Sequence, residues 1–418
     1  AAVLFLPAQE SASGNAVTTD SVLPALRKQV QQFVEQSPRY SCQLEIHRVQ
    51  DKVSTGQKME ERAVLEVSHV DGKEHYSWPG DSPFREDGLR DLLVMGLSGT
   101  GSFTEHLRAV VLGEHTTFGT ASSGSEGGHP VIRIPYRVPA GKSGYLVNLD
   151  GQENEAGIQG VITVIPPQMT VANFSLDATD LPAGFPATAV SEAIRYQVDS
   201  GVMGAFFPSS ATQRMVEMGK DVYTNEITYR ACKQFQGNSE IRFDAPSSSA
   251  GRNSEVAEGG ALPEGVPIEF RLTKDIRWGS VRAGDPVEAE LTRQIKWKGE
   301  VLVKERARVV GRVVEFKKLS GSANGYVVGL SFRLIEDKGK SMQVKASLEA
   351  LTDMPKSNRR GIAAAIRGEN APYERLERIR PDGAPYPGAG FICVAAEAEG
   401  LPAGLAMRWA TDDSRANY

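Results

Sequence analysis

The chain has 418 residues, of which 40% are hydrophobic and 24% charged, a globular composition that excludes wholesale disorder. At roughly 150 residues per domain, this length predicts two to three domains. The net charge of −5 argues against a dedicated nucleic-acid-binding protein. No apolar run reaches the roughly 20 residues that a membrane-spanning helix needs.

The chain starts with a short apolar run, residues 1–9, which is followed by polar residues. Such a run is too short to span a bilayer and is typical of the end of a secretory signal peptide. A disordered, mildly apolar terminus is the alternative. We favour export to the periplasm or the extracellular space, and we assign residues 1–19 to a signal-peptide remnant and disordered lead.

An amphipathic helix is predicted from residue 21 to 36, because apolar residues recur on one helical face and Asp20-Ser21 can cap it. From residue 40 the apolar residues alternate with polar ones, which predicts strands with one wet face. Residues 86–112 contain two short helical patches, and residues 115–244 contain successive strands with short turns. We therefore predict for residues 20–245 an α+β unit, a curved antiparallel half-barrel around a helix.

Residues 246–261 are rich in Ser, Gly and Ala and predict a flexible linker, because Val256 is the one sizeable apolar residue in 246–260. Short apolar alternations resume at residue 262 and predict a second, all-β unit over residues 262–418. A small barrel would protect its strand edges from aggregation. A basic, Pro- and Gly-rich loop, residues 352–390, interrupts this unit, and the whole chain is predicted to be mainly β.

Cys42, Cys232 and Cys393 are the three cysteines, and none has the spacing of a zinc site or a redox pair. Cys42 falls in the first predicted strand and Cys232 in the last one before the linker. The two can form a disulfide if these strands are neighbours, and two separately buried thiols are the alternative. Export would permit the disulfide to persist.

No nucleophile elbow, phosphate-binding loop, zinc-protease motif or dinucleotide fingerprint is present. We therefore predict no enzyme, no catalytic residue and no cofactor. His47, His69 and His75 could share one face of neighbouring strands, but none has a recognised ligand spacing, so we predict no metal site. The adjacent residues Glu60 and Glu61 point to opposite faces of a strand, so they cannot form a glycosidase-type dyad by themselves, and most acidic pairs of this kind are expected to be solvated.

The two helical patches of residues 86–112 are strongly apolar but interrupted by Ser and Gly. Small helices across the open side of a curved sheet could form a lid over a hydrophobic cavity. The alternative is that they close the core and leave no cavity. The candidate ligand-binding residues are Leu89, Leu92, Leu93, Phe103, Leu107, Val110 and Val111.

Five short motifs stand out before the linker. They are Tyr-Ser-Cys at 40–42, Asp-Gly-Lys-Glu at 71–74, Gly-Ser-Phe-Thr-Glu-His-Leu at 101–107, Asp-Leu-Pro-Ala-Gly-Phe-Pro at 180–186, and Glu-Ile-Thr-Tyr-Arg at 226–230 with Cys232 and Phe235. Together they resemble uncharacterised secreted bacterial proteins with a periplasmic domain of the LolA and RseB type. Over residues 20–245 the resemblance implies a half-barrel with a hydrophobic concave face, which in that superfamily receives acyl chains or lipoprotein segments.

Three motifs after the linker, at 262–265, 284–287 and 311–314, make this part similar to small β-barrels of envelope-spanning secretion channels. No catalytic residue comes with either resemblance. The second unit also distinguishes the chain from simple lipoprotein carriers.

These observations predict a non-enzymatic, exported envelope protein that binds a hydrophobic ligand, a lipid, lipoprotein or peptide, in the N-terminal half-barrel. The alternative is a structural or interaction module of the cell envelope without a small ligand. A hydrolase with an unrecognised site is a third hypothesis, supported only by the scattered histidines. The expected partners are a lipid, a lipoprotein or another envelope protein, and no nucleic acid.

Overall fold

The computed structural model describes residues 17–36, 39–70, 73–80, 89–93, 105–149, 152–198, 206–219, 221–235, 257–353, 373–376 and 388–412. Several predicted features lie outside the described residues. They are the lead up to residue 16, the 71–72 turn, Phe103, residues 246–256 of the linker, and most of the 352–390 loop.

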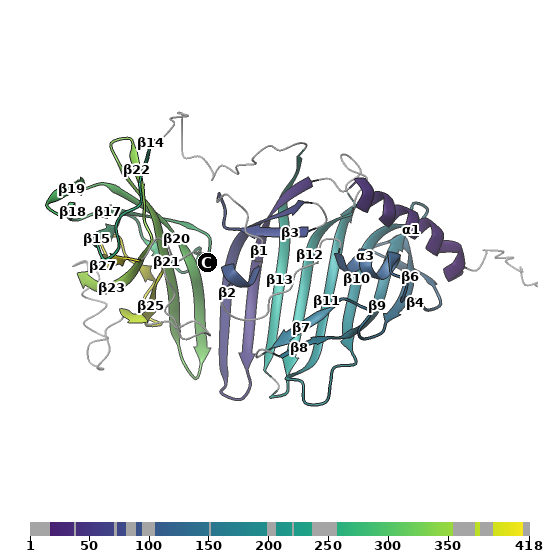
Figure 1. Ribbon diagram of the computed structural model, residues 1–418. Coiled ribbons are helices and arrows are strands. Elements are labelled where there is room, and N and C mark those ends of the chain that lie inside the picture. Colours follow the sequence, from purple (N-terminus) through teal and green to yellow (C-terminus); the bar gives the residue numbers. More distant parts are fainter. Residues whose placement is uncertain are drawn as a thin grey trace, which may run out of the picture.

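Helix α1 (Thr19–Gln36) lies across one face of the N-terminal sheet (Figure 1). It starts two residues before the predicted position, because Thr18 and Ser21 cap each other: each backbone N–H donates to the other's hydroxyl at 3.3 Å. The side chains of Val22, Leu26 and Val30 are buried against the sheet. Two short helices, α2 (Leu89–Leu92) and α3 (Glu105–Leu112), fall in the two predicted helical patches.

The N-terminal sheet is antiparallel, with the strand order β3-β2-β1-β13-β12-β11-β10-β9-β6-β5. Its strands are β1 (Arg39–Lys52), β2 (Gln57–Val70), β3 (Lys73–Ser77), β5 (Ser122–Glu126), β6 (His129–Val138), β9 (Gly157–Ile165), β10 (Thr170–Thr179), β11 (Ala187–Val198), β12 (Phe206–Glu217) and β13 (Val222–Phe235). The short strand β4 (Thr117–Phe118) also pairs with β6, and β7 (Leu146–Leu149) forms a separate hairpin with β8 (Gln152–Glu155).

The first strand of this sheet, β1, lies beside the last one, β13. Cys42 on β1 and Cys232 on β13 form a disulfide, the pairing that their strand positions made possible. The bridge lies where the register of the two strands shifts between Ser41 and Gln43. It therefore connects two adjacent strands that are 190 residues apart in the chain.

The C-terminal part pairs its strands in the order β23-β27-β15-β17-β20-β21-β25-β24. Strand β22 pairs antiparallel with β21, and β14 pairs in parallel with β22. The strands are β14 (Ala257–Gly259), β15 (Pro267–Leu272), β16 (Ile276–Arg277), β17 (Pro286–Leu291), β18 (Ile295–Trp297), β19 (Glu300–Val303), β20 (Arg308–Gly321), β21 (Gly325–Asp337), β22 (Lys340–Gln343), β23 (Ala346–Asp353), β24 (Tyr373–Leu376), β25 (Gly390–Val394), β26 (Gly400–Leu401) and β27 (Ala406–Thr411). Within the described residues, no ladder closes this sheet into a barrel.

The prediction of a mainly β chain is confirmed: two large antiparallel assemblies carry almost all of the regular structure. Strand β14 shows that residues 257–259 of the predicted linker are extended and paired with β22. The division into two units stays a prediction. Three apolar clusters are found among the described residues, two in the N-terminal part and one in the C-terminal part, except that Ala283 of the C-terminal part belongs to the larger N-terminal cluster.

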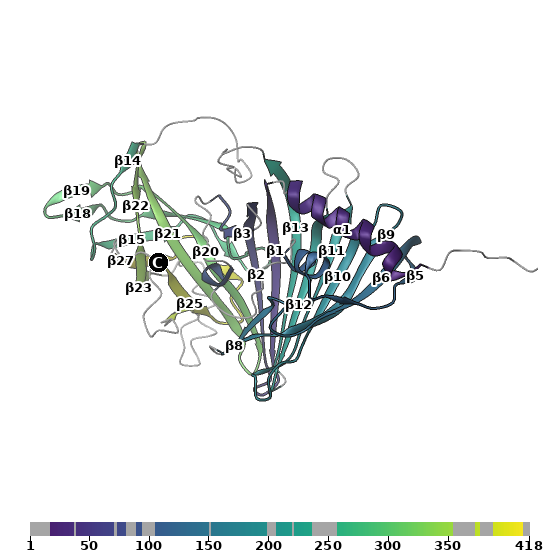
Figure 2. The same ribbon diagram turned by 45° about the vertical axis from the view of Figure 1, so that its right-hand side comes forward.

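The two parts meet along strand β2, where residues from both share one edge; we call this contact the seam. Residues 57–61 of β2 pair with residues 317–321 of β20. Next along β2, Ala283 donates to the Arg62 carbonyl at 2.8 Å and accepts from the Val64 N–H at 2.7 Å. The last residues of β2 pair with β3. Figure 2 shows β20 and β2 side by side, so the sheet continues from one part into the other.

Candidate functional site

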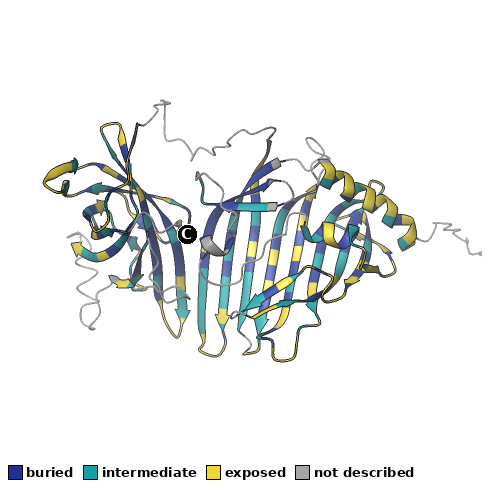
Figure 3. Cartoon of the chain, in the orientation of Figure 1, coloured by how far each residue is buried: buried dark blue, intermediate teal, exposed yellow. Residues whose placement is uncertain are grey.

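The candidate site is the inner face of the N-terminal sheet, the face on which α1 and α3 pack. Apolar residues from α1, α3 and alternate strand positions form one buried cluster there. Figure 3 shows exposed residues on the outward side of α1 and buried ones along the strands beneath it. This arrangement agrees with the predicted curved sheet around a helix.

Five buried polar residues cross the inner face in a single line, which we call the polar row. In spatial order they are Glu61 on β2, Arg48 on β1, Asn225 on β13, Gln213 on β12 and Glu192 on β11. Each lies directly opposite its neighbour in the strand register, so all five point to the same face. None is more than 6% exposed.

Hydrogen bonds connect the members of the polar row at each end. Arg48 Nη1 donates to Glu61 Oε2 at 2.7 Å, a buried ion pair. Asn225 Nδ2 donates to Gln213 Oε1, and Gln213 Nε2 donates to Glu192 Oε1, both at 3.1 Å. The amides therefore carry a continuous hydrogen-bond chain over three strands to the Glu192 carboxylate.

Helix α3 completes this chain from the opposite side. His106 Nε2 lies 3.3 Å from Glu192 Oε2, and the Glu192 side chain is only 2% exposed. Burial by itself lowers the pKa of His106, but the hydrogen bond and charge of Glu192, with the charges of Glu74 and Glu105, outweigh burial and raise it above its ordinary value. The contact therefore favours an imidazolium on a buried carboxylate.

Tyrosines surround the end of the polar row. The Tyr145 ring lies edge-on to His106 with 5.4 Å between ring centroids. Burial and the charge of Glu192 raise the pKa of Tyr136, Tyr145 and Tyr196, so these hydroxyls stay protonated. Near them, Tyr76 donates to Glu74 Oε2 at 2.5 Å.

The predicted ligand-binding residues are brought together, but as core residues. Leu107, Val110 and Val111 of α3 are at most 1% exposed, and Leu89, Leu92 and Leu93 are also buried in the same cluster. Phe103 lies outside the described residues. The packing of α3 agrees with core closure, the alternative to a lid over a cavity, and any ligand under α3 would have to displace it.

The polar row itself was missed, and Glu61 differs from the expectation that most adjacent acidic pairs are solvated. Glu60 pairs with Lys58 at 2.9 Å, whereas Glu61 is 6% exposed. A signal was present in the sequence, because each member of the row occupies a position in phase with the apolar inner-face residues. Glu192, for example, stands between Val190 and Ile194.

The three histidines considered for a metal do not converge. His47 lies on the outer face beside the exposed Glu226, at 3.4 Å, whereas His69 stacks on Tyr40 on the inner face. His75 lies opposite Ser68, so it points to the other side of the sheet from His69. Among the residues that the structure describes, no group of metal-ligating side chains is found.

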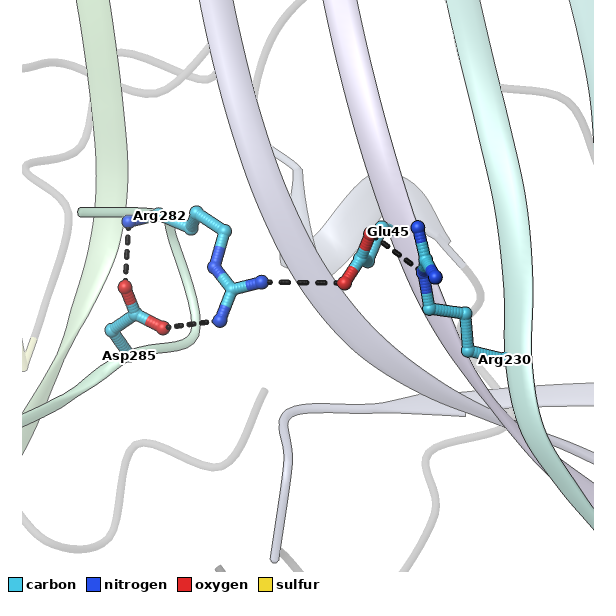
Figure 4. A network of polar contacts seen from close by, with 4 residues as sticks. All are labelled: Glu45, Arg230, Arg282 and Asp285. Atoms are coloured by element: carbon cyan, nitrogen blue, oxygen red, sulfur yellow. Dashed lines mark hydrogen bonds and ion pairs between the residues drawn. The ribbon is translucent and has the colours of Figure 1, made fainter. Parts of the chain in front are cut away.

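Ion pairs connect the two parts across the seam (Figure 4). Glu45 of β1 accepts from Arg230 Nε at 2.9 Å and lies 3.4 Å from Arg282 Nη1. The Asp285 carboxylate accepts from the Arg282 backbone N–H at 2.7 Å and from the Arg282 guanidinium at 3.3 Å. These side chains are partly exposed, so the pairs orient the two parts and contribute little free energy.

An open groove of about 450 Å³ lies in the C-terminal part, at the meeting of β21, β22 and the end of β27. Its lining includes the apolar Leu262 and Val344 and the charged Arg333, Lys345 and Asp412. The Asp412 carboxylate already accepts from the Gly388 N–H at 2.6 Å and the Ser347 hydroxyl at 2.8 Å. In the described helices, no segment has the length and apolarity to cross a membrane.

No protein-family model matches this chain, and no curated protein matches it. It is similar to the solved structure of a LolA superfamily protein from Nitrosomonas europaea, with 10% identity and a TM-score of 0.27. That match covers 53% of this chain and 95% of the other. A second similarity, to an AttH-type protein from the same organism, has 8% identity and a TM-score of 0.11 and covers 87% and 94% of the two chains. Similarities with TM-scores this low establish no function, so the function of this chain has to be inferred from its own geometry.

Proposed function

We propose that this chain is an exported, non-enzymatic envelope protein that binds a hydrophobic ligand between the inner face of the N-terminal sheet and helix α3. The observation that carries the proposal is the composition of that face: apolar side chains and a buried polar row lie together under a helix of eight residues. An amphiphile would place its chain among the apolar residues and its head on the polar row.

The buried polar row supports recognition as its role. A buried charged or polar network gives little stability compared with well-packed apolar residues of similar size, because each group must first lose its water. A gain in stability therefore does not explain why the polar row lies in the middle of an apolar face. Selection of a ligand does explain it. The Cys42–Cys232 disulfide supports export, since disulfides persist in oxidising compartments.

Entry of the ligand requires that α3 move, because its apolar side chains fill the space beneath it. A helix of this length has little stability of its own. Besides its apolar face, α3 is held by the contact of His106 with Glu192 and by Arg27 Nε of α1, which donates to the Val111 carbonyl at 3.3 Å. Displacement would therefore break both of these contacts and expose one apolar face.

Uptake of a neutral, hydrophobic fluorescent dye by delipidated protein tests this proposal, together with mass spectrometry of whatever copurifies. We expect saturable, stoichiometric uptake. Leu107→Ala should accelerate it, because the lost packing loosens α3 at a cost of about 2–5 kcal/mol in the free energy of unfolding. Val301→Ser, at a site 47% exposed in the C-terminal part, should leave uptake unchanged. The absence of saturable uptake in all three proteins would contradict the proposal.

A structural or interaction module of the envelope is the second candidate, favoured by the complete burial of Val110 and Val111 and by the continuous sheet across the seam. In that case the protein would bind a partner protein through its surface and no small ligand. Cross-linking to a defined envelope protein, combined with no uptake of the neutral dye, would support this candidate over the first.

A further inference from the structure

In the closed protein a cation from the covering helix occupies the end of the polar row. The His106 imidazole, carried by α3, lies 3.3 Å from the buried Glu192 carboxylate, whereas all five residues of the polar row belong to the sheet. A buried carboxylate is costly unless a cation or hydrogen-bond donors compensate it. If α3 moves away, Glu192 keeps the Gln213 amide at 3.1 Å but loses the imidazolium.

The remaining surroundings of this position are acidic and aromatic. Glu74 lies close enough for its charge to act on both His106 and Tyr196. The Tyr145 ring faces His106, and Tyr136 lies near Glu192. Carboxylates together with aromatic rings form the environment that binds organic cations.

The positive charge of the polar row lies at its other end. Arg48 is separated from Glu192 by strands β13 and β12, and Glu61 already holds it at 2.7 Å. An anionic head placed on Glu192 would therefore meet like charge, and two strands would still lie between it and Arg48. A cationic head would instead restore the contact that His106 makes in the closed protein.

From this geometry we infer that the ligand of the proposed function is an amphiphile with a cationic head, an ammonium or guanidinium group, which replaces His106 on Glu192. Helix α3 thus covers the site with a side chain that imitates the head of the ligand. The inference rests on the proposed function, because it concerns a ligand that displaces α3. What the inference adds is the chemical class of the ligand's head group, because the apolar face alone does not select a head group.

Three amphiphiles with the same alkyl chain test the inference: dodecylammonium, dodecanol and dodecanoate, each below its micelle concentration and competing with a bound fluorescent dye. Dodecylammonium should bind about tenfold tighter than dodecanol or more, because a charged hydrogen bond in a buried site is worth more than a neutral one. Dodecanoate should bind most weakly.

Glu192→Gln should abolish the preference for dodecylammonium over dodecanol, because it removes the charge that the cationic head would meet. Glu226→Gln removes the same charge from the exposed outer face of the same sheet and should keep the preference. His106→Gln provides a second variant if Glu192→Gln fails to fold. It removes the competing imidazolium, so dodecylammonium should bind tighter than to the unmodified protein.

Three results overturn the inference, and they can be told apart. Equal or stronger binding of dodecanoate than of dodecylammonium would refute the cationic head while leaving a hydrophobic ligand possible. If none of the three compounds displaces the dye, both the proposed function and the inference are refuted. Unchanged preference in folded Glu192→Gln would also overturn the assignment of the head to that residue.

Discussion

Glu66 is a buried carboxyl at the seam whose environment disfavours its charge. The residue is 4% exposed on β2, accepts from the Gly80 N–H at 3.2 Å, and lies near Arg312 of β20. Burial raises its pKa to about 7, although the Gly80 hydrogen bond and the charge of Arg312 act in the opposite direction. Burial also lowers the pKa of Arg312 to about 10.

The raised pKa of Glu66 predicts that the protein loses stability as the pH rises. The folded state binds the proton more tightly than the unfolded state, so the loss begins above the ordinary pKa and is complete above about pH 7. Glu66→Gln should therefore increase the free energy of unfolding by roughly 1–3 kcal/mol at about pH 8, and by much less at about pH 5. Denaturant unfolding at both pH values measures the difference. A less stable variant at the higher pH would show that pairing with Arg312 outweighs burial.

The residues of the candidate site differ in how far the sequence could predict them. The apolar residues of α3 followed from helical periodicity, which identifies a buried face but does not distinguish a lid from a core. The sequence shows that Glu192 and Gln213 each lie in phase with apolar residues of their own strand. It does not show that they lie beside each other, because that depends on how several strands pair.

At the scale of elements, the joint at residues 283–284 connects strands that belong to different parts of the chain. Gly284 has a φ of 101° and donates to the Val313 carbonyl of β20 at 2.7 Å. A Cβ added at this position would collide with the Val64 carbonyl oxygen of β2. The role of this joint in the seam was not visible in the sequence.

Gly284→Ala should destabilise the protein by roughly 2–4 kcal/mol, because strain at positive φ adds to the collision with β2. Gly299→Ala is a matched control: its φ is 91°, but nothing lies within 4 Å of the added Cβ. The control should cost about 1–2 kcal/mol from backbone strain alone. Thermal or denaturant unfolding of both variants provides the comparison, and equal losses would show that Gly284 is not constrained by β2.

At the scale of the whole molecule, the seam protects an edge that the N-terminal sheet would otherwise expose. Residues 57–64 of β2 bond to β20 and to Ala283, and unpaired strand edges promote association with other chains. The polar row also reaches the seam, since the buried Lys317 of β20 lies directly opposite Glu61. The two parts therefore share hydrogen bonds although, apart from Ala283, their apolar cores are separate.

A fragment ending at residue 245 should consequently be less stable than the same region in the full chain and should associate through β2. Size-exclusion chromatography and denaturant unfolding of the fragment, compared with the full chain, measure both effects. Addition of the separately produced C-terminal part should restore a monomeric complex. A monomeric fragment with an unchanged unfolding midpoint would show that the seam does not couple the two parts.

The sequence by itself determined the mainly β class, the positions of most strands and the amphipathic faces of α1 and α3, because hydrophobic periodicity is a local property. It also identified Cys42 and Cys232 as a possible pair. Tertiary structure alone decided that β1 lies beside β13, that five polar side chains meet in one row, and that β2 pairs with β20. Strand pairing between residues far apart depends on how whole faces pack, and no local pattern in the chain specifies it.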